Sequence, residues 1–77
     1  MKLSDFSSLQ SSNIDSVFYD PAKRQLAVMF RNAKGKAYVY RGVSQTTYTR
    51  LVNAGSPGAY FSKHIKEAYA YTIRRVN

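Results

Sequence analysis

Apolar and polar residues alternate along the middle of the chain, and this period of two indicates a β-sheet. The clearest run is Lys-Ala-Tyr-Val-Tyr-Arg at residues 36–41, which places Tyr38 and Tyr40 on one face of a strand. Aromatic and β-branched residues favour strands, and Gly42 ends the run. A basic residue lies at each end of this strand. The direction in which Tyr38 and Tyr40 point therefore decides whether they belong to the core or to a binding surface.

Two earlier segments are expected to pair with that strand. Residues 14–19 end in β-forming residues and stop before Pro21, which cannot donate a hydrogen bond to a ladder. Residues 25–31 alternate again and lead through Asn-Ala-Lys-Gly, a connection of hairpin length, into residues 36–41. The three segments together predict a three-stranded antiparallel meander.

The period of the pattern becomes helical after the third strand. Ser44 is a good N-cap for a helix over residues 45–54, whose apolar positions recur at helical spacing. Pro57 suits the first turn of a second helix, expected over residues 58–67. Residues 68–73 fit either a continuation of this helix or a strand, because their apolar residues also alternate. An extended segment is favoured there.

These elements predict one α+β domain: a three-stranded antiparallel meander packed against two short helices, with a short C-terminal extended segment. A chain of 77 residues has room for one domain. Residues 13–77 are expected to form it. Residues 1–12 are serine-rich and too short for a stable isolated helix, so they are expected to be a flexible N-terminal tail.

The direction of the two tyrosines in the third strand has two interpretations. Facing outward, Tyr38 and Tyr40 would offer a platform on which nucleic-acid bases stack. Facing inward, they would join Phe30 in the core. The inward orientation is favoured because one face of the sheet must be buried and these are its bulkiest residues. The opposite face, with Met29 and Val39, is only mildly apolar. We expect this face to be exposed to solvent, to be covered by the tail, or to serve as a contact surface.

The charge of the chain points to an acidic partner. The formal net charge is +8, and residues 21–77 carry eleven Lys and Arg against Glu67 alone. A basic domain of this kind attracts polyanions, such as nucleic acid or an acidic protein. There is no cysteine, which excludes disulfides and fits a cytoplasmic location. No run of apolar residues approaches the length that crosses a membrane. We also expect no secretory signal, because no apolar run follows the charged residue near the N-terminus.

Catalytic chemistry has little support in the sequence. His64 is the only histidine, and only Glu67 stands near it as an acid. Metal sites need three or four ligands, and a serine nucleophile needs a base and an orienting acid. We therefore expect no enzymatic activity, no metal and no cofactor. His64 is interpreted as a partly exposed helix residue beside two lysines.

Basic residues interleaved with aromatic residues are the remaining signal, and they predict binding of RNA or single-stranded nucleic acid. The alternative is a protein-interaction module that binds an acidic protein through the Met29 and Val39 face or through the tail. The interpretation of each basic residue that requires no binding function is a side chain exposed to solvent. The candidate residues are Lys34, Lys36, Arg41, Lys63, Lys66, Arg74 and Arg75 for phosphate contacts, and Tyr38 and Tyr40 for stacking if they are exposed.

The order of several short motifs resembles the KTSC domain, a family named for the C-terminal end of some lysyl-tRNA synthetases. The resemblance covers about residues 11–71. Members of this family occur as synthetase appendages and as free-standing small proteins in bacteria and phages, and the shortness of this chain leads us to expect a free-standing member. The resemblance implies RNA binding as the suggested function and no catalytic residues to carry over. Apart from its last two residues, the predicted N-terminal tail has no counterpart in the family pattern. The matching positions are Ser12-Asn13-Ile14, Tyr19-Asp20, Leu26 to Phe30, Gly35, Tyr38-Val39-Tyr40, Gly42-Val43, Tyr48, Leu51, Ala54, Ser56, Gly58, Tyr60-Phe61, Ile65-Lys66 and Tyr69.

Overall fold

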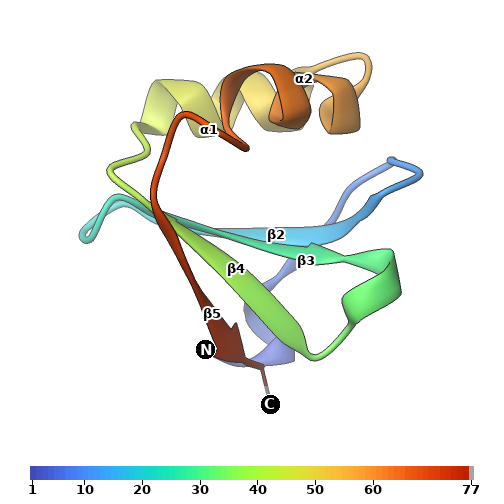
Figure 1. The fold of residues 1–77 in the computed structure, drawn as a ribbon, viewed down its shortest axis with the longest axis vertical. Coiled ribbons are helices and arrows are strands. Elements are labelled where there is room, and N and C mark those ends of the chain that lie inside the picture. The colour runs from blue at the N-terminus through green and yellow to red at the C-terminus, as the bar shows by residue number, and fades with distance from the viewer. Residues whose placement is uncertain (77) are drawn as a thin grey trace.

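Five antiparallel strands form one sheet, and two helices lie across one of its faces (Figure 1). The structure is a computed structural model, and it describes residues 1–76. The strands follow one another in the sheet in their sequence order, β1 to β5. The elements are β1 (Ser7–Ser8), β2 (Ile14–Asp20), β3 (Gln25–Phe30), β4 (Lys36–Arg41), α1 (Gln45–Asn53), α2 (Pro57–His64) and β5 (Tyr71–Arg75), with short 3-10 turns at Leu3–Asp5 and Arg31–Ala33.

The α+β class and the two helices are confirmed, but the prediction of a three-stranded sheet is wrong. The three predicted strands are β2, β3 and β4. The C-terminal extended segment becomes β5 and pairs with the otherwise free edge of β4. Pairing satisfies backbone groups that an isolated extended segment would leave to water. At the other edge β1 pairs with β2, so the sheet begins within the segment assigned to the tail.

The helices begin where the sequence indicates. The Ser44 Oγ accepts a hydrogen bond of 3.1 Å from the Thr47 N–H and so caps α1. Pro57 occupies the first turn of α2. This helix ends at His64, three residues before the predicted end. The N–H groups of Ile65 and Lys66 both bond to the Phe61 carbonyl, an arrangement found where a helix ends and the chain continues in turns. No helix among residues 1–76 is long and apolar enough to cross a membrane.

The main core lies between the sheet and the helices. Tyr40 is only 3% exposed, which confirms the inward orientation for this residue, whereas Tyr38 packs at the margin of the core and stays partly exposed. Side chains from both helices complete the core and hold them on the sheet through apolar burial. Its buried members are Ile14, Val17, Leu26, Val28, Tyr40, Val43, Leu51, Phe61 and Ile65.

A second, smaller apolar cluster covers the other face of the sheet. Met29 and Val39 are each 1% exposed, together with the buried Ala27, Ala37 and Val76. Phe6 and Phe18 pack against them, with their ring centroids 6.0 Å apart. Of the three interpretations of this face, the structure shows the one in which the N-terminal segment covers it.

Candidate nucleic-acid interface

The pairing of β4 with β5 places aromatic and basic residues side by side. Tyr71 lies opposite Tyr40, and Ile73 lies opposite Tyr38. Residues directly opposite each other in an antiparallel ladder point to the same face. Tyr71 and Ile73 therefore extend the tyrosine face of β4, on the side of the sheet where the helices lie.

Five aromatic rings close into a cycle on this face. The ring-centroid distances are 5.4 Å for Tyr71 to Tyr38, 5.2 Å for Tyr38 to Phe30 and 5.5 Å for Phe30 to Phe61. Phe61 lies 5.4 Å from Tyr40, and Tyr40 lies 5.3 Å from Tyr71. The interplanar angles, from 39° to 79°, are tilted or edge-to-face, as aromatic pairs prefer. We call these five residues the aromatic cluster.

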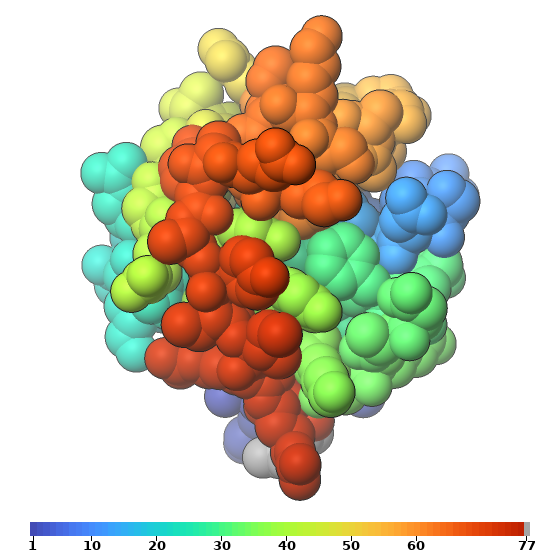
Figure 2. Space-filling view, viewed as in Figure 1, coloured from blue at the N-terminus to red at the C-terminus, as the bar shows by residue number. Residues whose placement is uncertain are grey.

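The aromatic cluster lines an open groove of about 440 Å³ beside the C-terminal end of α2. Lys66 and Glu67 complete its wall. The helices leave the β5 end of the sheet uncovered, so Tyr71 is 48% exposed and Ile73 is 52% exposed. Figure 2 shows this face, with β5 in red across the front, the end of the helical region in orange above it, and side chains of β4 in yellow-green between them.

One of the predicted phosphate-binding residues lines this groove, and two others lie on the same face of the sheet. Lys66 lines it directly. Lys36 and Arg75 lie opposite each other at the far end of the β4–β5 ladder and belong to the same face as Tyr38. Both side chains are exposed. Together with the predicted Tyr38 and Tyr40, these residues make one surface in which aromatic rings adjoin positive charge.

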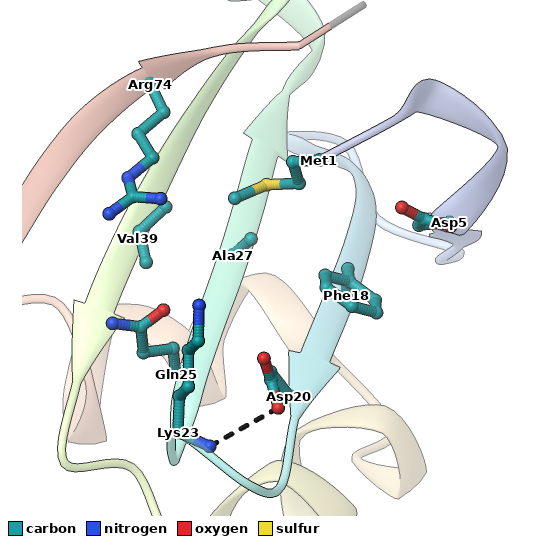
Figure 3. Close-up of a pocket in the computed structure, with 9 residues that line it drawn as sticks. All are labelled: Met1, Asp5, Phe18, Asp20, Lys23, Gln25, Ala27, Val39 and Arg74. Carbon is teal, nitrogen blue, oxygen red and sulfur yellow. Dashed lines mark hydrogen bonds between the residues drawn. The ribbon is translucent and has the colours of Figure 1, made fainter.

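Two other predicted residues lie on the opposite face of the sheet. Arg41 follows Val39 by two positions in β4, and Arg74 lies opposite Ala37. Figure 3 shows Arg74 beside Val39 in a separate pocket that also contains Asp20 and Lys23. Asp5 and Asp20 balance Lys23 and Arg74 in this pocket, as Glu67 balances Lys66 in the groove. Within residues 1–76, Phe18 is the only aromatic residue that lines it, so the pocket is less suited than the groove to hold an unpaired base.

The last two predicted residues are also apart from the groove. The Lys34 Nζ lies 3.7 Å from the Asp15 carboxylate, which also approaches Arg31 at 3.6 Å. The charge of Lys34 is thus partly neutralised within the protein. Lys63 stands two positions after the buried Phe61, and this spacing puts it on the outer side of α2.

The sequence reasoning missed Phe30, Phe61, Glu67 and Tyr71 as members of the candidate site. The alternation of Tyr69, Tyr71 and Ile73 contained a signal for a strand. The missing information was the register, because only the pairing with β4 shows that Tyr71 meets the aromatic face.

One tyrosine hydroxyl in the groove has a shifted pKa. Burial, and secondarily the neighbouring Tyr71 and Tyr38, raise the pKa of Tyr40 to about 12. Its hydroxyl is therefore protonated at neutral pH and is a hydrogen-bond donor. Among residues 1–76 no three His, Asp or Glu side chains gather as a metal site. The ring of His64 lies 4.5 Å from that of Tyr60 on α2.

Comparison with known proteins gives a consistent result. The model of the KTSC domain matches residues 10–69. The crystal structure of a KTSC domain protein from Yersinia pestis superposes with a TM-score of 0.77 at 30% sequence identity, covering 94% of this chain and 96% of that one. No curated protein matches the sequence.

Proposed function

The chain belongs to the KTSC domain family, and we propose that it is a non-enzymatic protein that binds RNA or other single-stranded nucleic acid in the groove of the aromatic cluster. One observation carries the proposal: a closed cycle of aromatic rings opens to solvent beside three basic residues. Sequence-tolerant binding of single strands combines these two features. The lack of cysteine also favours a cytoplasmic location for such a protein.

The aromatic part of the groove suits an unpaired base. Tyr71 is half exposed, and Tyr38 lies next to it with its ring centroid 5.4 Å away. Unpaired bases stack on such rings, whereas bases within a duplex are already stacked on one another. The groove volume of about 440 Å³ is also within the range of sites that hold small organic groups. These features favour a single strand over a duplex.

The basic part of the groove suits the phosphates of the same strand. Lys66 lines the groove beside Glu67, and Lys36 and Arg75 lie on the same face of the sheet, two positions from Tyr38 and Ile73. A strand that crosses the aromatic cluster and continues along the β4–β5 ladder can therefore reach all three basic residues. Three phosphate contacts with a single strand predict a slope of about −2 in a plot of log affinity against log salt concentration.

Titration of labelled single-stranded RNA and DNA at several salt concentrations tests the proposal. Lys66→Gln should weaken binding and reduce the salt slope by about 0.7, the value for one phosphate contact. Lys63→Gln is the matched control, because it removes the same charge three residues away on the outer side of α2. Equal losses in the two variants would mean that binding follows net charge and not the groove. No binding at low salt would reject the proposal.

An acidic protein partner at the Met29 and Val39 face receives no support. Both side chains are buried beneath the N-terminal segment, so they offer no contact surface. Any acidic protein partner must therefore use a different part of the molecule.

A further inference from the structure

The outer edge of β5 is open. Within residues 1–76, β5 pairs only with β4, and all five of its residues are exposed. The opposite edge of the sheet is different, because β1 is only two residues long. A long exposed edge is a ready template for pairing with another strand, whereas a very short one is poorly suited to it.

The hydrogen bonds of the β4–β5 ladder show which backbone groups are free. The Arg41 N–H donates to the Ala70 carbonyl, and the Val76 N–H donates to the Gly35 carbonyl. Bonding alternates along an antiparallel ladder, so Thr72 and Arg74 also bond toward β4.

The alternate residues of β5 point their backbone groups the other way. The N–H and C=O groups of Tyr71, Ile73 and Arg75 are directed away from β4. They offer three donors and three acceptors in a row. These groups form a site distinct from the groove, because they belong to the backbone and lie along the edge of the sheet.

We propose that the outer edge of β5 binds an extended acidic peptide segment, which adds to the sheet as a sixth strand. Backbone hydrogen bonds to a sheet edge supply affinity, and the side chains of the added strand supply specificity. The charge of β5 selects the occupant. Arg74 and Arg75 project to opposite faces, so an incoming strand meets positive charge whichever face it presents. A second copy of this chain, with its net charge of +8, is repelled.

The register defines the peptide sequence that fits best. Antiparallel pairing is the more common arrangement, and it places consecutive peptide residues opposite Arg75, Arg74, Ile73, Thr72 and Tyr71 in that order. Acidic residues suit the first two positions and a β-branched apolar residue suits the third, because opposite charges and apolar pairs stabilise cross-strand neighbours. The core Glu-Asp-Val-Thr-Val meets these requirements.

Fluorescence anisotropy of the full chain with a labelled peptide containing this core tests the proposal. We expect saturable binding that a peptide with Lys-Lys in place of Glu-Asp does not show. N-methylation of the first valine, opposite Ile73, removes a backbone donor directed at the protein and should weaken binding by about tenfold. N-methylation of the following threonine alters a donor that points away from β5, so it should have little effect.

A pair of protein variants tests the same edge by altering β5 instead of the peptide. Ile73→Pro removes only an N–H that points outward, and proline is tolerated on edge strands in that position. Ile73→Pro should therefore weaken peptide binding by about tenfold. Ile73→Ala keeps the N–H, so it should change the affinity for the peptide far less. Circular dichroism checks that both variants fold. If Ile73→Pro does not fold, the two N-methylated peptides decide the question with the unaltered protein.

Three results would overturn the proposal: equal binding of the acidic and basic peptides, equal effects of the two N-methylations, or sedimentation showing a dimer that Ile73→Pro abolishes. The last result would identify a second copy of the chain as the occupant of the edge. Nucleic-acid binding is measured separately with Ile73→Pro. Because that variant retains every charge and ring of the groove, the two proposals can fail independently.

Discussion

Tyr71 lies directly opposite Tyr40 in the β4–β5 ladder, and their ring centroids are 5.3 Å apart. Tyr40 is buried and Tyr71 is half exposed, so the pair joins the core of the domain to its surface. A contact between the two rings thus links the stability of the sheet to the candidate nucleic-acid interface.

Replacing the exposed ring of this pair should affect binding more than folding. Tyr71→Ala removes a stacking surface and should weaken binding of single-stranded RNA by roughly 1–3 kcal/mol. Tyr71→Phe keeps the ring and should bind within about threefold of the unaltered protein, because stacking and not the hydroxyl supplies this contact. Both affinities are measurable by fluorescence titration. Equal losses in Tyr71→Ala and Tyr71→Phe would point to the hydroxyl instead.

Alkaline pH should destabilise the domain through Tyr40. Burial raises the pKa of Tyr40 from 10.0 to about 12, so the folded state holds this proton more tightly than the unfolded state. The resulting stability is fully present below pH 10 and is lost as the pH rises through about 12. The loss is roughly 2–3 kcal/mol, from 1.36 kcal/mol for each unit of pKa.

Urea unfolding at pH values between 9 and 12 measures this loss. Tyr40→Phe should flatten the dependence on pH, leaving a smaller part that comes from Tyr48, whose pKa burial also raises. A pH dependence of unchanged size in Tyr40→Phe would contradict the assignment.

The cap of α1 should contribute measurably to stability. Ser44→Ala removes the acceptor for the Thr47 N–H and should lower the free energy of unfolding by about 1 kcal/mol. Ser62→Ala is a suitable control, since Ser62 is exposed within α2 and does not cap it. Thermal melting of both variants makes the comparison. A loss in Ser62→Ala as large as that in Ser44→Ala would argue against a specific capping effect.

Phe6 should be more important for stability than its place in the N-terminal segment suggests. Its ring packs on the second apolar cluster, so Phe6→Ala should cost about 1–2 kcal/mol, less than full burial of a phenylalanine would give. Leu3 is 57% exposed, and Leu3→Ala should have little effect. Denaturant unfolding followed by circular dichroism measures both. A denaturant unfolding curve for Phe6→Ala that coincides with that of the unaltered protein would show that the segment does not cover the sheet in solution.

The three central strands and the cap of α1 were predictable because their signals are local. Alternation over residues 25–31 and 36–41 requires no knowledge of distant contacts, and Ser44 meets its partner only three residues away. The fifth strand was only partly predictable. Residues 71–75 have the pattern of a strand, but their membership of the sheet depends on pairing with β4, which lies on the far side of both helices in sequence.

Part of the candidate site was predictable because some of its residues are close together in the sequence. Lys36 and Tyr38 are neighbours within one strand, so the sequence places them together. Lys34 lies apart from that group, in the β3–β4 connection, where its Nζ is 3.7 Å from the Asp15 carboxylate of β2. Charge and composition carry no information about such pairings, which the sheet alone determines.

The position of β5 at the edge of the sheet makes the groove dependent on local opening of this strand. An edge strand with five exposed residues is the part of a sheet that opens first in local unfolding. When it detaches, Tyr71 leaves the aromatic cluster and the groove loses one wall. A ligand held in the groove must slow this opening, so the amides of Thr72 and Arg74, which bond toward β4, become reporters of occupancy by hydrogen exchange.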